Sequence, residues 1–312
     1  MTINFPTTAF IFPGQGSQTV GMGRDLAAAF PIAKETFDEA DSLLGFPLSK
    51  LMWDGPADEL NDTINTQPAL YVHSLAAWRV LSLQFPDLRP AALAGHSLGE
   101  LSALAASRAL TFADGLNLVR TRGQLMKRAG ELAPGGMAAI LNLGIPELEK
   151  VCVEASREGE SVQVANDNCP GQVVISGAKP AVERAMELAK AAGAKRALPL
   201  AVSIAAHSSL MNSIQPEWDA AVKAVTMRDA SAPIFGNVAA RALTSADDLR
   251  ADIRAQMRSR VRWTESAREM IGSGIRHFVE VGSGSVLGGL VKRIDASVTS
   301  QPLGNPSDFE SV

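Results

Sequence analysis

Short apolar runs alternate with longer segments of helical period along most of this chain. The apolar runs are expected to be strands and lie at residues 9–12, 91–94, 233–238 and 278–281. The helical segments lie at 26–44, 68–83, up to 107, 113–130, from 208 onward, 247–258 and 264–271. Strands that alternate with helices pair in parallel, because each helix carries the chain back to the start of the next strand. The pattern therefore predicts an α/β fold with a mostly parallel sheet.

The middle of the chain interrupts this alternation. Strands are expected at 137–143, 162–165, 173–176 and 195–200, and helices at 146–158 and 180–192. This order, β-α-β-β-α-β, is typical of a ferredoxin-like unit. We therefore predict a ferredoxin-like subdomain over residues 133–201, inserted into a larger α/β domain made of residues 1–132 and 202–312. The tail from Gln301 is expected to be a surface extension.

Composition and charge argue against several functions. The 312 residues are 46% hydrophobic and 20% charged, as in an ordinary globular protein of two structural units. A formal net charge of -4 argues against a nucleic-acid partner, because phosphate backbones favour basic proteins. No stretch approaches the roughly 18 apolar residues of a membrane helix, and no signal peptide is visible. We therefore expect a cytoplasmic protein in which Cys152 and Cys169 are buried as small hydrophobic side chains.

Residues 95–99, Gly-His-Ser-Leu-Gly, match the G-x-S-x-G pattern of a nucleophilic serine. An apolar strand precedes the motif and a helix follows it, so Ser97 is predicted to lie on a tight turn with its hydroxyl exposed. The flanking glycines allow the close backbone approaches that such a turn requires. The free N–H groups at the start of the helix would point toward a developing oxyanion. Ser97 is therefore the candidate nucleophile.

A serine needs a base before it can act as a nucleophile at neutral pH. The chain has four histidines. His96 is adjacent to Ser97, but on such a turn its side chain should point away from the hydroxyl. His73 lies in an expected helix and His277 begins the last strand, so both are interpreted as packing or surface residues. His207 lies in a loop before a helix, where a catalytic base and an exposed loop histidine are equally compatible with the residues alone.

No acidic member of a catalytic triad stands out. Asp114, Glu131 and Asp167 lie between the serine and the histidine, where α/β-hydrolases place this acid, but none has a distinctive setting. An HGGG-type oxyanion loop is also missing. A simple esterase is therefore not the favoured interpretation, although a serine thioesterase or esterase and a non-catalytic scaffold stay open as alternatives.

Two glycine-rich segments follow expected strands, at residues 14–18 and 282–289. Neither completes a dinucleotide-binding fingerprint, because Thr19 and Leu287 stand where the third glycine is required, and neither contains the lysine of a phosphate loop. The second segment is interpreted as a strand-to-helix turn. The glycines of the first are equally explained by a backbone that approaches the serine site.

Taken together, the motifs of this chain resemble those of the malonyl-CoA:acyl carrier protein transacylases. The motifs are FPGQGSQ at 12–18, GHSLGE around Ser97, TRGQLM at 121–126, PGQVVISG at 170–177, AAHSSLM around His207, GNV at 236–238 and EVGSGSVLGGLVKRI at 280–294. Each is weak alone, but their joint order along the chain is specific. The resemblance implies a hydrolase-like α/β domain with an inserted ferredoxin-like subdomain, which agrees with the pattern above.

The resemblance also implies the roles of the residues that carry out the reaction. Ser97 would be the nucleophile and His207 its base. The backbone N–H groups of Gln15 and Leu98 would form the oxyanion hole. Gln256 would help to orient the histidine through its backbone, so that a main-chain carbonyl takes the place of a triad aspartate.

The resemblance assigns substrate selectivity to two further positions. Arg122 would hold the free carboxylate of a malonyl group, since a guanidinium binds a carboxylate through two parallel hydrogen bonds. Without the resemblance, Arg122 would be taken for an ordinary charged residue on an amphipathic helix. Ala206 is small where many relatives carry Phe or Ser, so we expect a substituted malonyl group to fit as well.

The implied activity is transfer of a malonyl group from malonyl-CoA to the phosphopantetheine thiol of acyl carrier protein, supplying fatty acid synthesis. A trans-acting acyltransferase of polyketide synthesis is the alternative with the same chemistry. The reaction would need no cofactor besides the coenzyme A thioester that is its substrate, and no metal. The expected partners are malonyl-CoA and acyl carrier protein, with no nucleic acid or membrane, and the expected state is a monomer.

Overall fold

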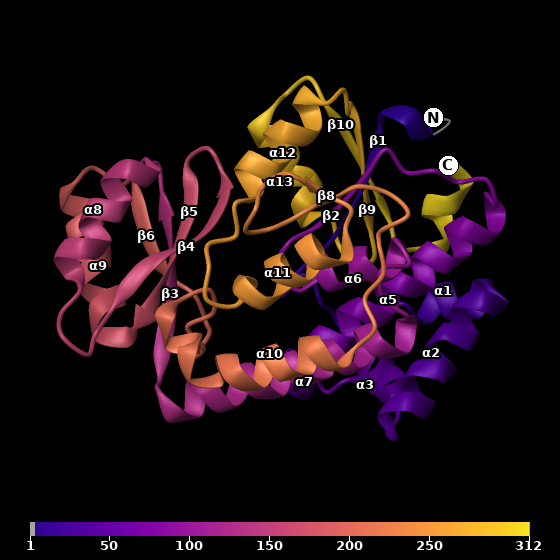
Figure 1. Cartoon of the computed structure of the whole chain (residues 1–312), viewed down its shortest axis with the longest axis horizontal. Coiled ribbons are helices and arrows are strands. Elements are labelled where there is room, and N and C mark those ends of the chain that lie inside the picture. The colour runs from indigo at the N-terminus through magenta and orange to yellow at the C-terminus, as the bar shows by residue number, and fades with distance from the viewer. Residues whose placement is uncertain (1–3, 312) are drawn as a thin grey trace.

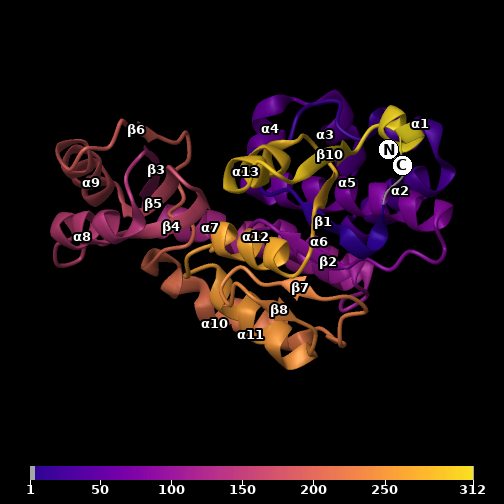
Figure 2. The same ribbon diagram turned by 90° about the horizontal axis from the view of Figure 1, so that it is seen from above.

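The computed structural model describes residues 4–311 and contains two sheets (Figures 1 and 2). The strands of the larger, sheet A, are in spatial order β10 (Thr299–Leu303), β9 (His277–Val281), β1 (Thr8–Phe12), β2 (Ala92–Gly95), β7 (Ile234–Phe235) and β8 (Ala242–Leu243). Neighbouring strands are parallel except for β7 and β8, which are antiparallel. The predicted α/β fold with a mostly parallel sheet is confirmed.

Sheet A is buried on both faces, which explains why its central strands are apolar without interruption. Side chains alternate along β1, so Phe10 and Phe12 join one hydrophobic core while Ala9 and Ile11 join the other. The helices outside the middle segment are α1 (Arg24–Ala29), α2 (Pro31–Leu44), α3 (Leu48–Asp54), α4 (Ala57–Asn61), α5 (Thr63–Gln84), α6 (Gly99–Ala106), α7 (Phe112–Leu132), α10 (Gln215–Ala224), α11 (Ala246–Gln256), α12 (Trp263–Gly272) and α13 (Val286–Ile294). The first core packs mainly against α2, α5, α6 and α7, and the second against α12 and α13.

The middle segment forms the smaller sheet, sheet B, at one end of the molecule (Figure 1). Its elements are β3 (Gly135–Leu141), α8 (Ile145–Ala155), β4 (Val162–Cys169), β5 (Gln172–Ala178), α9 (Lys179–Ala191) and β6 (Arg196–Pro199). The spatial order is β4-β5-β3-β6, and all pairs are antiparallel. This is the ferredoxin-like topology predicted from the sequence. All these elements lie within residues 133–201; the domain boundaries themselves stay a prediction.

The helix predicted at 68–83 begins five residues earlier than expected, at Thr63, and contains Pro68 in its second turn. A proline has no N–H to donate to the carbonyl four residues before it. That carbonyl, on Ile64, instead accepts a hydrogen bond of 2.8 Å from Arg120 on α7. A hydrogen bond between two helices therefore replaces the backbone hydrogen bond that Pro68 cannot make. Sequence periodicity cannot predict such a contact.

The prediction for the tail was wrong. Residues from Gln301 onward do not leave the surface, since β10 extends sheet A beside β9 and Leu303 is fully buried. The strand was missed because it is an edge strand, TSQPL, with only one buried side chain. The helix expected at 26–44 is divided between α1 and α2 at Pro31. Helices α3 and α4 were not predicted, and a 3₁₀ turn, η2 (Ser209–Ile214), precedes α10.

Within residues 4–311, no helix is both long enough and apolar enough to cross a membrane. Cys152 and Cys169 are both buried and unpaired, as predicted.

Candidate active site

Ser97 lies on a turn between β2 and α6, and the geometry of this turn admits only glycine at positions 95 and 99. Its φ of 53° is in the left-handed region, as expected for a nucleophile on a strained turn. A Cβ on Gly95 would lie 2.0 Å from the carbonyl carbon of Gly99, and one on Gly99 would lie 2.0 Å from the carbonyl oxygen of Phe12. The motif's glycines are therefore required by contacts between backbones.

Asn237 holds this turn in place. Its Oδ1 accepts a hydrogen bond of 2.7 Å from the backbone N–H of Ser97, and its Nδ2 donates one of 2.7 Å to the carbonyl of Gly95. Asn237 is 2% exposed, so these bonds are shielded from water. The sequence contained Asn237 only as part of the GNV motif, and reasoning from the residues assigned it no role.

His207 contacts Ser97 directly. Its Nε2 lies 2.8 Å from the Ser97 Oγ, and its Nδ1 lies 2.9 Å from the carbonyl oxygen of Gln256. A carbonyl can only accept, so Nδ1 carries the proton and Nε2 is the acceptor for the serine hydroxyl. Burial, together with the charge of Arg122, lowers the pKa of His207 to about 3. The imidazole is therefore neutral at neutral pH, which is the state a general base requires.

The remaining histidines have other partners. The His96 Nε2 lies 2.9 Å from Asn168 Oδ1, and its ring packs on Trp263, away from the serine hydroxyl as predicted. His73 is buried in α5 with its Nε2 2.9 Å from the carbonyl of Gly304. His277 contacts Thr299 at the exposed end of β9.

In the described part of the chain, none of the acids weighed for a triad forms a hydrogen bond with the His207 ring, although Glu131 lines the same cavity. Among residues 4–311, the partner of its Nδ1 is the carbonyl of Gln256, not a carboxylate. Asp114 pairs with Thr111 at the start of α7, and Asp167 accepts a hydrogen bond of 2.6 Å from Thr264. A carbonyl orients the ring as an aspartate would but adds no negative charge. This is consistent with a pKa of His207 that stays low.

Arg122 extends from α7 into the same site and is 2% exposed. Its Nη2 donates to the Ser97 Oγ at 3.0 Å and to the Gln256 Oε1 at 2.9 Å, and its Nη1 donates to the Gln67 Oε1 at 2.8 Å. Its Nε is buried with no partner among the described residues. Burial lowers the pKa of Arg122 to about 10, so the side chain stays protonated at neutral pH.

Among residues 4–311, the hydrogen-bond partners of this guanidinium are Gln67, Ser97 and Gln256, and none of them is a carboxylate. The nearby acid, Glu100 on α6, is 2% exposed and accepts a hydrogen bond from the Gln256 Nε2. Burial and the neighbouring carboxylate of Asp252 raise the pKa of Glu100 well above its usual value, which favours the neutral form of this side chain. A buried cation without a counter-ion is costly. The arrangement therefore favours an anionic ligand beside Ser97. Sequence reasoning missed Gln67 and the role of Glu100.

Gln15 and Leu98, whose backbone N–H groups are predicted to form an oxyanion hole, both lie in segments next to Ser97. Leu98 follows the nucleophile at the start of α6, and Gln15 lines the same cavity as Ser97. A Cβ on Gly14 would lie 2.5 Å from the carbonyl oxygen of His96, so this glycine segment does approach the serine turn closely. Among the described residues, neither the Gln15 N–H nor the Leu98 N–H has a hydrogen-bond acceptor. Both donors are free for a ligand.

Ser97 and His207 open onto a cavity of about 860 Å³ between the two sheets. Sheet B contributes Met137 and Val174 to its wall, and α7 contributes Arg122. Ala206 also lines it, next to the histidine. The volume is in the range of pockets that enclose a small organic ligand. Among residues 4–311, no group of three or more His, Cys, Asp or Glu side chains is arranged to hold a metal ion.

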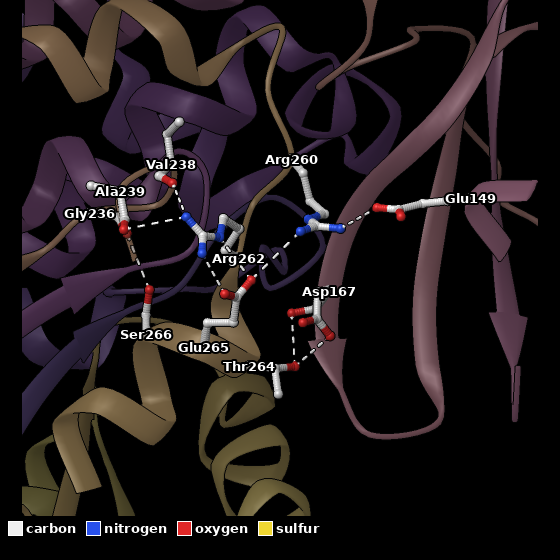
Figure 3. Close-up of polar contacts among 10 residues, drawn as sticks. All are labelled: Glu149, Asp167, Gly236, Val238, Ala239, Arg260, Arg262, Thr264, Glu265 and Ser266. Atoms are coloured by element: carbon white, nitrogen blue, oxygen red, sulfur yellow. Dashed lines mark hydrogen bonds and ion pairs between the residues drawn. The ribbon is translucent and has the colours of Figure 1, made fainter. Parts of the chain in front are cut away.

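The segment after Gln256 joins the two units (Figure 3). The Val261 N–H donates to the Ala165 carbonyl at 2.8 Å, and the Val261 carbonyl accepts from the Asp167 N–H at 2.9 Å. Arg260 forms ion pairs with Glu149 on α8 at 2.9 Å and with Glu265 on α12 at 3.7 Å. The carbonyl that orients His207 therefore lies at the start of the segment that binds sheet B to the larger unit.

These features define a class of protein: enzymes in which a serine on a strand-to-helix turn, paired with a neutral histidine, forms a covalent intermediate. Residues 9–300 match the model of the acyl transferase domain family. The chain is 46% identical over 299 residues to the malonyl CoA-acyl carrier protein transacylase of Escherichia coli (strain K12), covering 96% of each chain.

Solved structures agree with this relation. The acyl carrier protein S-malonyltransferase of Vibrio cholerae O1 biovar eltor superposes with a TM-score of 0.94 at 42% identity, covering 98% of this chain and 99% of that one. A malonyl-transacylase solved with its holo type II PKS acyl-carrier protein superposes with a TM-score of 0.93 at 40% identity, covering 97% and 98%. The chain belongs to the acyl transferase family.

Proposed function

We propose that this protein transfers the malonyl group of malonyl-CoA to the phosphopantetheine thiol of acyl carrier protein through a malonyl-serine intermediate. The observation that carries the proposal is that the Ser97 Oγ lies within hydrogen-bonding distance of both His207 Nε2, at 2.8 Å, and Arg122 Nη2, at 3.0 Å. A base and a carboxylate-binding cation thus converge on one nucleophile. Malonyl CoA-acyl carrier protein transacylases are close relatives by sequence.

In the first half-reaction, the neutral His207 takes the proton of the Ser97 hydroxyl as the Oγ attacks the thioester carbonyl. The negative charge that develops on that oxygen is stabilised by the free N–H groups of Gln15 and Leu98; losing one such donor typically costs ~10²–10³ in rate. The C–S bond then breaks, and His207 returns the proton to the departing coenzyme A thiolate. Ser97 is left as the malonyl ester.

The second half-reaction reverses this chemistry with a different thiol. The phosphopantetheine thiol of the carrier protein gives its proton to His207 and attacks the malonyl ester. The bond between the acyl carbon and the Ser97 Oγ breaks, and the proton on His207 returns to the serine. No electrons are gained or lost overall and no third reactant is consumed, so we propose that the enzyme needs no cofactor and no metal.

Arg122 would bind the free carboxylate of the malonyl group. Its buried Nε lacks a partner among the described residues, and its Nη2 hydrogen bond to the Ser97 Oγ is one that an incoming carboxylate can replace. A carboxylate there would receive two parallel hydrogen bonds and neutralise the buried charge. This contact selects dicarboxylic acyl groups over acetyl, and it fixes the intermediate away from attack by water.

An acidic carrier protein would dock on basic residues, and several of the arginines in this chain already have acidic partners. Arg254 pairs with Asp219, Arg260 with Glu149, and Arg262 with Glu265. We therefore propose Lys195, Arg196 and Arg258, which form no ion pair among the described residues, as the groups available to an acidic carrier. The monomeric state, the absence of a nucleic-acid partner and the cytoplasmic location stay predictions from the sequence.

The pathway we propose is fatty acid synthesis. Transfer to a polyketide carrier is the alternative, and the solved complex with a type II PKS acyl-carrier protein is the observation in its favour. Rates of transfer to the two kinds of carrier, measured side by side, would separate these pathways.

The decisive experiment is intact-mass spectrometry after brief exposure to malonyl-CoA, with Ser97→Ala as the control. We expect a malonyl adduct on the wild-type protein alone, discharged by a carrier thiol much faster than by water. An adduct that water removes equally fast would indicate a serine thioesterase. No adduct at all would indicate a non-catalytic scaffold.

A further inference from the structure

A second cavity, of about 800 Å³, lies at the end of β2 and α6 opposite to Ser97. Leu93 near the start of β2 and Ala106 at the end of α6 line it, whereas Ser97 lies between the end of β2 and the start of α6. The two cavities share no lining residue. Nothing in the proposed transacylase reaction uses this second cavity.

Four arginines from four different segments line the second cavity. Arg79 is on α5, Arg89 precedes β2, Arg108 follows α6, and Arg228 follows α10. No acidic residue is among the lining residues. Arg79 is partly buried and the other three are exposed, so water and salt screen their mutual repulsion, and a bound anion would relieve what remains.

Three of these guanidiniums have no acidic partner. Arg79 pairs with Glu39 at 2.6 Å and stacks on Phe112, 4.4 Å from the ring centroid. Arg89, Arg108 and Arg228 form no ion pair among the described residues. The cavity wall therefore carries three exposed guanidiniums that form no ion pair with the described residues.

The backbone holds two of these arginines side by side. Arg108 has φ of 64° because it caps the C-terminus of α6: its N–H donates to the Ala105 carbonyl at 3.0 Å, and the Ala109 N–H donates to the Leu104 carbonyl at 2.9 Å. The segment that carries Arg228 runs along it, since the Arg228 N–H donates to the Ala109 carbonyl at 2.9 Å and the Ser231 N–H donates to the Ser107 carbonyl at 3.0 Å. The two paired segments therefore bring Arg108 and Arg228 to the wall of the same cavity.

We propose that this cavity binds a small anion with two or more phosphate charges. Three guanidiniums match a multiply charged phosphate, to which arginine presents paired N–H donors. The hydroxyls of Ser82 and Ser231, which also line the cavity, supply further donors. A fatty acid fits the apolar wall of Trp78 and Leu93 but brings a single charge, so it leaves most of the positive charge uncompensated.

The test uses inorganic pyrophosphate as the probe and isothermal titration calorimetry as the measurement, with dodecanoate as the singly charged, apolar comparison. We expect saturable pyrophosphate binding that weakens as salt is added. The double variant Arg108→Asn/Arg228→Gln should bind at least tenfold more weakly. Asparagine tolerates the left-handed backbone, so this variant removes charge without adding strain.

The matched control is Arg157→Gln/Arg268→Gln, which removes two exposed arginines outside the cavity and should bind as wild type does. Trp78 lines this cavity and not the catalytic one, so pyrophosphate should change tryptophan fluorescence in wild type and not in Trp78→Phe. Malonyl loading of Ser97 should be the same in the Arg108/Arg228 variant and in wild type, which separates this proposal from the transacylase activity.

No saturable pyrophosphate binding, or equal binding by the Arg108/Arg228 variant, would show the proposal to be wrong. Tight binding of dodecanoate with none of pyrophosphate would show that the ligand class is wrong. If the double variant fails to fold, the single variant Arg228→Gln, altered at an exposed position, gives the same comparison with a smaller expected loss.

Discussion

Arg122 has an effect on His207 besides its proposed contact with substrate. Its positive charge disfavours a second positive charge on the imidazole, and with burial it lowers the pKa of His207 to about 3. The base form therefore persists as the pH falls and is lost only as the pH passes below that lowered pKa. We expect the labelling rate of Ser97 by an uncharged fluorophosphonate to stay constant from about pH 8 to about pH 5.

In Arg122→Gln, the loss of labelling rate at low pH (the acid limb of the profile) should begin at a higher pH than in wild type. Removing the neighbouring charge lets the imidazole take up a proton at a pH higher by roughly 1 unit, while burial still keeps its pKa below the usual value. Arg128→Gln, an exposed position on the same helix, is the matched control and should leave the limb in place. An acid limb that does not differ between wild type and Arg122→Gln would mean that the two side chains are not electrostatically coupled.

Ala206 is the residue at which substrate range can be tested. It lines the catalytic cavity next to His207, and its side chain is a single methyl group. We expect Ala206→Phe to reduce kcat/KM for methylmalonyl-CoA by about tenfold relative to malonyl-CoA, since one methyl group in a tight pocket is worth 10-fold or more. The ratio of kcat/KM for the two substrates is the measurement. A ratio equal to that of wild type would show that this position does not limit the size of the acyl group.

At the scale of elements, β4 of sheet B supports the histidine loop through Gln163. The Gln163 Nε2 donates to the carbonyls of His207, at 3.1 Å, and Arg258, at 3.3 Å, while its Oε1 accepts from the Ser209 N–H at 3.2 Å. One side chain thus connects the small unit to the segments on both sides of the catalytic base. It touches neither Ser97 nor the proposed oxyanion donors, so it is a positioning residue.

Gln163→Ala should lower kcat for malonyl loading by about tenfold with little change in KM, because it loosens the base without altering the substrate pocket. Gln172→Ala, which removes a glutamine on β5 that contacts Arg293, should leave both constants unchanged. Stopped-flow or quenched measurement of Ser97 acylation supplies the rates. A larger effect on KM than on kcat would contradict a positioning role.

The elements also show how far periodicity predicts this fold. The parallel sheet and the ferredoxin-like insertion could be predicted because buried strands and amphipathic helices each have a characteristic spacing of apolar residues. The edge strand β10 has no such spacing, since only one of its side chains is buried. The start of α5 was missed because Pro68 reads as a helix start, and only the tertiary bond from Arg120 to Ile64 explains its place inside.

At the scale of the whole molecule, the site is assembled from positions far apart in the chain. Ser97 could be predicted from its local pattern, since the glycines and the strand-to-helix turn are encoded within five residues. His207, Arg122 and Gln256 required the family resemblance, because their sequence separation gives no information on distance. Gln67, which holds the Arg122 guanidinium, gave no signal, as a buried glutamine on an apolar helix differs little from a packing residue.

Both an ion pair and buried apolar contacts hold sheet B against the larger unit. The catalytic cavity lies between these two units. Arg260 forms an ion pair with Glu149 of the small unit (Figure 3), but the side chain of Glu149 is 57% exposed. Val261 is fully buried in a core that also contains Cys169 of β4 and Trp263 of α12. Exposed ion pairs contribute little, whereas buried apolar contacts between units contribute more.

We therefore expect Val261→Ala to lower the free energy of unfolding by about 2 kcal/mol and Glu149→Gln by less than about 1 kcal/mol. Urea denaturation followed by far-UV circular dichroism supplies both values, and added salt should diminish only the effect of Glu149→Gln. Val261→Ala should also slow malonyl loading, because the segment that begins at the Gln256 carbonyl would no longer be fixed to β4. If Glu149→Gln proved as destabilising as Val261→Ala, the junction would depend on charge, and malonyl loading should then fall steeply with ionic strength.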